Sequence, residues 1–141
     1  MDTDKQARIL VVDDEEEIRK TLSRHFRFEG FQVYTAANGV EALEVLNTKR
    51  MEIVITDILM PHMDGIELIR EVQAQYPMIH TIVITGSVRM HHLLAALRHG
   101  ADTCIFKPIE DMQELDDAVN RAMDHLRTWQ RKLRELQGMA P

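Results

Sequence analysis

The chain has little of what a secreted or membrane protein needs. Its 141 residues include one cysteine, Cys104, so an internal disulfide is impossible and a reducing compartment is favoured. No apolar run approaches the roughly 20 residues that span a bilayer. The polar start Met-Asp-Thr-Asp-Lys-Gln carries no signal-peptide apolar region. We therefore expect a cytoplasmic protein that does not enter a membrane.

A basic excess is also missing. The 17 lysines and arginines are outnumbered by 23 aspartates and glutamates, which gives a formal net charge of −6. Binding to nucleic acid generally needs a basic face, so direct nucleic-acid binding by this chain is not expected. Apolar residues make up 45% and charged residues 28%, which is typical of one globular domain with a substantial core.

Five short runs that read as strands alternate with helical patterns along the chain. The runs, rich in β-branched residues, predict strands at 9–12, 31–36, 53–55, 80–85 and 103–106. Four of them are apolar on both faces, and the connections have the length of strand–helix–strand crossovers. This pattern predicts a parallel sheet covered by helices on both sides, with the 31–36 strand at an edge.

The predicted helices follow from apolar stripes and from their stop signals. The first stripe, which ends at Gly30, consists of Ile18, Leu22, Phe26 and Phe28. A short helix with the stripe Ala42, Leu43 and Leu46 is expected after Asn38-Gly39. Further helices are expected near 65–75, from Val88 to Gly100, and from about 111 to well past 130. No sequence repeat or internal domain boundary interrupts this alternation.

Polar residues stand directly after four of the five predicted strands. They are Asp13 and Asp14, Asp57, Thr85, and Lys107. Parallel strands all point the same way, so the residues at their carboxyl ends gather along one edge of the sheet, where sites form. We therefore expect three carboxylates, a hydroxyl and an ammonium group to meet there.

This combination of groups suits phosphoryl chemistry. Clustered carboxylates repel one another, and a divalent cation relieves the repulsion. Oxygen ligands favour Mg2+ over zinc or copper. A lysine and a hydroxyl can hold a compact anion such as phosphate. Asp57, held beside them, is placed to attack phosphorus and form an acyl phosphate.

Each residue also has an ordinary structural explanation. Asp13 and Asp14 could cap the helix that follows them, Thr85 could bond to backbone, and Lys107 could be a surface lysine before a turn. Each of these explanations accounts for one residue but not for the whole set. A suitable polar group after four of five strands is not expected by chance, so the joint arrangement favours a site.

Several segments together resemble the receiver domain of two-component response regulators. They lie at 9–15, 57–65, 85–86, 100–102 and 107–108, in the order and at the spacing of that family. The resemblance covers about residues 8–126 and is specific as a set. It implies an α/β, flavodoxin-like, doubly wound fold with five parallel strands in the order 2-1-3-4-5.

The resemblance also implies roles for single residues. Asp57 matches the phosphate-accepting aspartate, Asp13 and Asp14 match the acidic pair that holds Mg2+, and the Ile58 backbone carbonyl would be a further metal ligand. Lys107 would contact the phosphoryl oxygens. A cis Lys107–Pro108 bond would point its side chain into the site. Thr85 would move toward the phosphoryl group. Gly86 matches a small residue that leaves an entry path to the site open. Leu59 and Ser87 match two positions that tune the rate of dephosphorylation.

The implied function is a phosphorylation-dependent switch in a phosphorelay. Asp57 would accept a phosphoryl group from a sensor histidine kinase or a phosphotransfer protein, and this phosphoprotein would then control an output domain, a dimer or a partner. Its only catalysis would be the transfer of the phosphoryl group to Asp57 and the autodephosphorylation of Asp57, so it would not otherwise be an enzyme. An alternative is a receiver-like interaction module that works without phosphorylation. An aspartyl-phosphate phosphatase is disfavoured, because its Asp-x-Asp motif is missing after the first strand.

One position departs from the family pattern. Tyrosine or phenylalanine often stands three residues before the lysine, where this chain has Cys104. Phe106 directly precedes Lys107 and should point to the opposite face of the strand. The usual aromatic switch is therefore in doubt, and Cys104 is interpreted as a small buried strand residue rather than as a redox sensor.

The last helix continues beyond a receiver. Its apolar residues recur in steps of four and three, as in a heptad repeat: Leu115, Val119, Ala122, Leu126, Trp129, Leu133 and Leu136. We predict a receiver domain at 1–126 and a helical extension at 127–141, acting as a coiled coil or as a linker to an output domain. A homodimer is expected through this helix, or through the face made by the helix before Gly100, the 103–106 strand and the last helix. Folding of the extension back onto its own domain is the other possibility.

Overall fold

A computed structural model describes residues 7–87 and 89–139. Their strands form one parallel sheet in the order β2-β1-β3-β4-β5, as predicted, with β2 at an edge. The strands are β1 (Arg8–Val12), β2 (Gln32–Ala36), β3 (Ile53–Thr56), β4 (His80–Thr85) and β5 (Thr103–Phe106). The predicted α/β class and strand order are confirmed.

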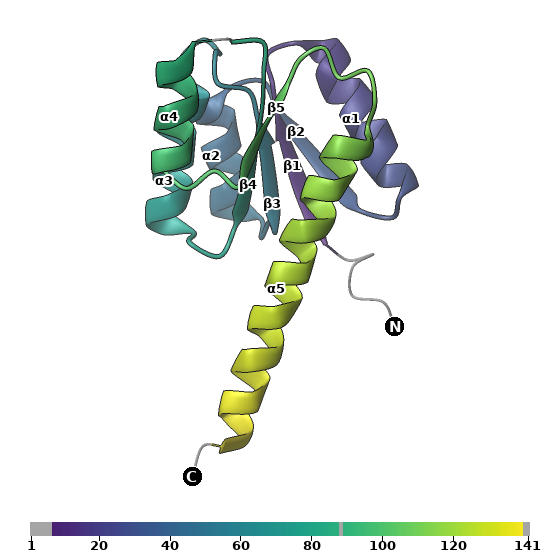
Figure 1. Cartoon of the computed structure of the whole chain (residues 1–141), viewed down its shortest axis with the longest axis vertical. Helices are drawn as coiled ribbons and strands as arrows, with labels where there is room; N and C mark the ends of the chain where they lie inside the picture. Colours follow the sequence, from purple (N-terminus) through teal and green to yellow (C-terminus); the bar gives the residue numbers. More distant parts are fainter. Residues whose placement is uncertain (1–6, 88, 140–141) are drawn as a thin grey trace.

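Helices cover both faces of this sheet, with α1 and α5 on one side and α2, α3 and α4 on the other (Figure 1). They are α1 (Glu16–Phe28), α2 (Gly39–Thr48), α3 (Gly65–Gln75), α4 (Met90–Arg98) and α5 (Gln113–Met139). In the part of the chain that the structure describes, none of them is both long and apolar enough to cross a bilayer.

The two layers of core follow from the alternation of side chains along β1. Ile9 and Val11 face α1 and α5, while Leu10 and Val12 face α2 and α3, and all four are fully buried. Burial on both faces explains why the strands read as continuous apolar runs rather than as alternating ones. The sheet is therefore held rigidly between two sets of helices.

The structure corrects one member of the predicted α1 stripe. Leu22 and Phe26 are buried, but Phe28 is 92% exposed, because α1 ends there and Gly30 turns the chain at φ 101°. Val88, predicted to open α4, lies outside the described residues, as do residues 1–6 and the last two residues of the predicted 127–141 extension.

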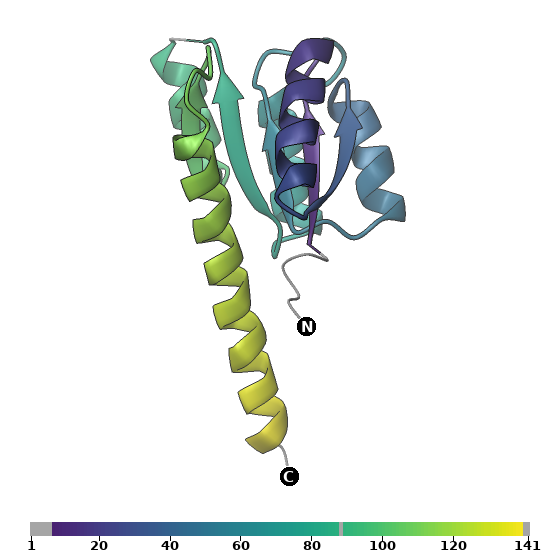
Figure 2. The ribbon, with the colours of Figure 1, turned by 90° about the vertical axis from the view of Figure 1, so that its right-hand side faces the viewer.

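The last helix, α5, is 27 residues long and runs far past the sheet (Figures 1 and 2). Its apolar stripe divides at Leu126, the last buried residue. Beyond that point Trp129, Leu133 and Leu136 are 49%, 51% and 64% exposed. The described part of the extension therefore does not fold back onto its own domain.

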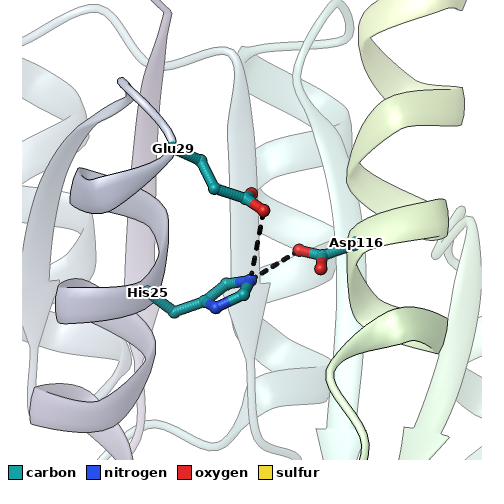
Figure 3. Close-up of side chains that lie close together, drawn as sticks. All are labelled: His25, Glu29 and Asp116. Atoms are coloured by element: carbon teal, nitrogen blue, oxygen red, sulfur yellow. Dashed lines mark hydrogen bonds and ion pairs between the residues drawn. The ribbon is translucent and has the colours of Figure 1, made fainter.

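A histidine between two carboxylates joins α1 to α5 (Figure 3). His25 Nε2 lies 2.7 Å from Asp116 Oδ1 and 3.5 Å from Glu29 Oε2. Burial and the nearby Asp116 charge raise the pKa of Glu29. The bridge holds the start of α5 against the end of α1 on one face of the sheet.

Gly65, the first residue of α3, fixes the turn that follows β3. Its N–H donates to the Ile58 carbonyl at 2.8 Å. A Cβ at this position would stand 1.9 Å from the Asp57 carbonyl oxygen. The preceding residue, Asp64, caps α3 by accepting the Glu67 N–H at 2.9 Å. Only glycine lets α3 start this close to the end of β3.

Replacing Gly65 with alanine is expected to destabilise the domain by at least about 2 kcal/mol, because the new methyl group displaces the β3 backbone. Urea denaturation measures the change. Gly138→Ala is the matched control, since a Cβ there meets nothing within 4 Å; its effect should be neutral or a gain of up to about 1 kcal/mol from helix propensity. Equal stability of the Gly65→Ala protein and the wild type would contradict this account of the turn.

Candidate functional site

The polar residues that follow the strands lie together at the carboxyl edge of the sheet. Carboxylate oxygens of Asp13, Asp14 and Asp57 all lie within 4.8 Å of one another. Beside them is an open pocket of about 320 Å³. Its lining consists of Asp14, Glu15, Asp57, Leu59, Thr85, Gly86, Ser87 and Lys107. The convergence predicted from strand direction is therefore present.

Asp57 is placed by the backbone at the end of β3. Its N–H continues the ladder to β1 by donating to the Val12 carbonyl at 3.0 Å. Its carboxylate is held at both oxygens, since Oδ1 accepts the Ile58 N–H at 2.6 Å and Oδ2 lies 2.9 Å from Lys107 Nζ. The residue is only 6% exposed. Its orientation is thus fixed before any ligand binds.

Asp13 and Asp14 differ in their surroundings. Asp13 is fully buried, and its Oδ1 accepts the Glu15 N–H at 2.8 Å. Its Oδ2 lies 2.9 Å from Lys107 Nζ as an ion pair, but it accepts no hydrogen bond of good geometry from the described residues. Burial, together with the Asp57 charge, raises the pKa of Asp13. A buried oxygen in this state suits a cation, while Asp14 is exposed at the pocket.

Lys107 is the cation that this edge of the sheet already contains. Its Nζ lies 2.7 Å from Glu15 Oε2 and 2.9 Å from both Asp13 Oδ2 and Asp57 Oδ2. Burial alone would lower the pKa of Lys107, but its contacts with the carboxylates of Glu15, Asp57 and Asp13 outweigh burial and raise the pKa. The lysine therefore stays charged across the neutral range. The Lys107–Pro108 bond is cis, as predicted.

Thr85 ends β4 next to this group. It is fully buried, and its hydroxyl oxygen accepts the Ser87 N–H at 3.1 Å. Its carbonyl accepts the Lys107 N–H at 2.8 Å, which links β4 to the start of the lysine loop. Between Thr85 and Ser87, a Cβ on Gly86 would meet nothing within 4 Å. Gly86 therefore stands at an open side of the pocket.

Glu15 is a site residue that sequence reasoning missed. The 9–15 segment includes it but no role was expected for it, yet it makes the shortest contact with Lys107, 92 positions away in the chain. Its place directly after the acidic pair was the available signal. With a side chain that is 59% exposed, Glu15 can leave the lysine when another anion arrives.

The Ile58 carbonyl does not fit its predicted role as a metal ligand well. It accepts the Gly65 N–H at 2.8 Å, and Ile58 is absent from the lining of the pocket. The next residue, Leu59, does line the pocket, and no described N–H donates to its carbonyl. Sequence position alone could not separate these neighbours, because the path of the turn decides which carbonyl faces the acids.

Cys104, which stands where the family often has an aromatic residue, lies among apolar side chains. Cys104 is half-buried and packs against a cluster that includes Ile58, Val83 and Ala96. Burial raises the pKa of its thiol, which disfavours the reactive thiolate. Phe106 is 53% exposed, while Lys107 points into the site. The only aromatic side chain of β5 therefore lies at the surface.

Taken together, the sheet order and the charged carboxyl edge define a doubly wound α/β domain with an acidic pocket that contains one lysine. The chain belongs to the response regulator receiver domain family, because the model of that family matches residues 9–120. Receiver domains bind Mg2+ at their acidic pocket and interact with histidine kinases or phosphotransfer proteins, and this chain has an acidic cluster of Asp13, Asp14 and Asp57.

Two characterised relatives illustrate the range of the family. Sporulation initiation phosphotransferase F of Bacillus subtilis is 35% identical over 114 residues, which cover 81% of this chain and 91% of the relative. Regulatory protein AtoC of Escherichia coli is 36% identical over 129 residues, covering 92% of this chain. This chain spans only 28% of the length of AtoC.

Solved structures give the same result. A receiver domain protein from Methanospirillum hungatei superposes with a TM-score of 0.83 at 28% identity, over 87% of this chain and 98% of that one. The response regulator TrrA from Thermotoga maritima, solved in complex with Mg2+ and beryllofluoride, has a TM-score of 0.75 at 32% identity, over 83% and 99% of the two chains.

Replacing Asp13 with asparagine is expected to stabilise the metal-free protein at pH 7. Burial raises the Asp13 pKa above 3.8, so the ionised carboxylate costs stability at neutral pH. The cost fades as pH falls through the folded-state pKa, and the gain should vanish below about 3.8. Urea denaturation in a chelator at several pH values measures it.

Asp14→Asn serves as the matched control for this measurement. Asp14 is exposed, so its replacement should change the stability of the metal-free protein by less than about 0.5 kcal/mol. A destabilised Asp13→Asn protein at pH 7 would show that the contact with Lys107 outweighs the cost of burying the carboxylate.

Proposed function

We propose that this chain is a phosphorylation-dependent switch in which Asp57 accepts a phosphoryl group from a sensor histidine kinase or a phosphotransfer protein. The observation that carries the proposal is the nearly buried Asp57 carboxylate, which lies against the Lys107 ammonium and beside two further acids. Such a carboxylate is held in position, and its charge is balanced, at the edge of an open pocket.

The transfer step needs one nucleophile and a way to hold the phosphoryl charge. Asp57 Oδ2 attacks phosphorus, the bond from phosphorus to the donor's imidazole nitrogen breaks, and the electron pair stays on the imidazole. The Ile58 N–H, bonded to Oδ1, keeps the carboxylate in position. Lys107 Nζ, 2.9 Å from Oδ2, is close enough to contact the incoming phosphoryl oxygens.

The acids at the pocket fit a divalent ion with oxygen ligands. Asp13, Asp14 and Asp57 would hold Mg2+, which would neutralise charge on the phosphoryl group. For the backbone ligand we assign the Leu59 carbonyl in place of the Ile58 carbonyl, because the latter is bonded to Gly65 and lies outside the pocket lining. Glu15 would release Lys107 as the phosphoryl group takes its place.

The response to phosphorylation would begin at Thr85 and reach the surface near it. The Thr85 hydroxyl can donate to a phosphoryl oxygen once it turns toward the pocket. Met90, Leu94 and Leu97 of α4 and Phe106 of β5 are between 42% and 70% exposed. An apolar surface of this kind, adjacent to the site, suits a protein partner that reads the state of Asp57.

We do not propose that the protein turns over any other substrate. The chemistry is limited to self-catalysed transfer to Asp57 and hydrolysis of its acyl phosphate. This chain spans 28% of the length of AtoC, so we propose, by analogy with such longer relatives, that it controls an output domain. We also propose that it acts in the cytoplasm and does not bind nucleic acid directly. The stripe of Trp129, Leu133 and Leu136 supports a homodimer through α5.

Replacing Asp57 with asparagine is expected to abolish labelling by a small acyl phosphate in the presence of Mg2+, since the nucleophilic oxygen is lost. Intact-protein mass spectrometry detects the added phosphoryl group. Asp117→Asn, a change at an exposed acid on α5, should leave labelling at the wild-type level. Persistent labelling of the Asp57→Asn protein at another residue would refute the assignment.

The same experiment separates the switch from a module that works without phosphate. In the wild type, beryllofluoride with Mg2+ should protect Asp57 from labelling, and omission of Mg2+ should remove the protection. A wild-type protein that is neither labelled nor affected by beryllofluoride would favour the phosphate-independent module.

Replacing Leu133 with serine is expected to weaken self-association, because it interrupts the exposed apolar stripe of α5. Sedimentation equilibrium over a range of concentrations measures the change. Lys132→Ser, one position away and off the stripe, should associate like the wild type. A wild type that stays monomeric at all concentrations would rule out the α5 homodimer for this chain.

A further inference from the structure

A histidine and two carboxylates meet between α1 and α5, outside the acidic pocket (Figure 3). His25 Nε2 lies 2.7 Å from Asp116 Oδ1 and 3.5 Å from Glu29 Oε2. One nitrogen or oxygen atom from each of the three side chains lies within 4.8 Å of the other two. None of the three residues lines the acidic pocket. This group is therefore a second place where side chains able to bind a metal ion converge.

The backbone of two helices sets the positions of the three side chains. His25 and Glu29 are four residues apart at the end of α1, a spacing that places two side chains on the same side of a helix. The Glu29 N–H donates to the His25 carbonyl at 3.2 Å, so Glu29 continues the helical turn. Asp116 faces this pair from the first turn of α5. Two ligands therefore come from one helix and the third from the helix beside it.

The distances within the group fit a tetrahedral ion. Zinc bonds of about 2.0–2.1 Å to imidazole nitrogen and carboxylate oxygen separate the ligand atoms of a tetrahedral site by about 3.3 Å. The 2.7 Å and 3.5 Å distances from His25 Nε2 lie on either side of this value. The side chains of His25 and Glu29 are 26% and 37% exposed, so they can rotate slightly and an ion can reach them.

The charges around the group also favour a cation. Among the residues that the structure describes, no lysine or arginine forms an ion pair with Glu29 or Asp116. The carboxyl end of α1 adds the negative end of a helix dipole. A protonated His25 supplies one positive charge for two carboxylates, whereas a divalent ion balances both of them.

The ligand atoms determine which ion suits this group. Sites made only of oxygen atoms, such as the cluster of Asp13, Asp14 and Asp57, favour Mg2+. An imidazole nitrogen combined with carboxylates instead suits Zn2+ and similar transition-metal ions. Three protein ligands leave a fourth position of a tetrahedral ion for water. The two groups of this chain should therefore bind different ions.

We propose that His25, Glu29 and Asp116 bind a Zn2+ ion that joins the end of α1 to the start of α5. The ligands come together only when both helices pack on the sheet, so binding of the ion stabilises the folded domain. The site does not depend on phosphorylation, because it shares no residue with the acidic pocket.

Isothermal titration calorimetry with Zn2+ in excess Mg2+ tests the three ligands. His25→Gln and Glu29→Gln should each weaken Zn2+ binding at least about tenfold, because each removes one ligand. Glu29→Gln leaves the 2.7 Å contact between His25 and Asp116 in place, so its effect does not require a change of fold. His99→Gln and Glu44→Gln, which change the same residue types outside the group, are the matched controls and should bind Zn2+ like the wild type.

Nuclear magnetic resonance of the histidine rings locates the ion. Zn2+ should shift the Nε2 resonance of His25 and leave the ring of His99 unchanged, both in the wild type and in Asp57→Asn, whose phosphorylation is blocked. Zn2+ at ten times its Kd should also raise the folding equilibrium constant of the wild type about elevenfold in urea denaturation. An unchanged His25 ring would overturn the proposal. So would a Glu29→Gln protein that binds Zn2+ as tightly as the wild type.

Discussion

Charge balance around Lys107 is the constraint on which the functional end of this molecule depends. One ammonium group lies within 2.9 Å of Asp13, Glu15 and Asp57, and these contacts raise its pKa against the effect of burial. Without it, the acids at the ends of β1 and β3 would face one another in a poorly solvated place. The lysine therefore permits an acidic pocket to exist before any metal or phosphoryl group is bound. It also makes the pocket responsive, since an incoming anion competes for the same contacts.

The opposite end of the sheet carries a second polar arrangement. The acidic pocket is organised by full charges, whereas the Trp129–His125–His80–Asp102 series is organised by the direction of its hydrogen bonds. Both involve β4, through Thr85 and His80 respectively. A buried strand of this kind moves as a unit, because its neighbours pack against it on both faces. The acidic pocket and α5 therefore both contact β4.

Much of the fold was predictable because the strands carry an unusually plain signal. β1 and β3 are buried on both faces, so their β-branched runs stand out, and α3 lies at its predicted limits near 65–75. The errors lie where a local pattern cannot show what covers a residue. Phe28 continues the stripe of α1 in sequence, but the helix ends before its side chain meets the sheet. Glu15 was given no role, because its contact with Lys107 joins residues that are 92 positions apart in the chain.

The sequence by itself determined the class of the fold and which residues end the strands, because hydrophobic period and strand direction bring Asp13, Asp57, Thr85 and Lys107 to one edge. Only the tertiary structure decided how those residues are used. The turn held by Gly65 engages the Ile58 carbonyl and leaves that of Leu59 available at the pocket. Packing buries the α5 stripe as far as Leu126 and exposes it from Trp129 onward. These outcomes depend on distances between segments remote in the chain, and no local pattern of residues encodes such distances.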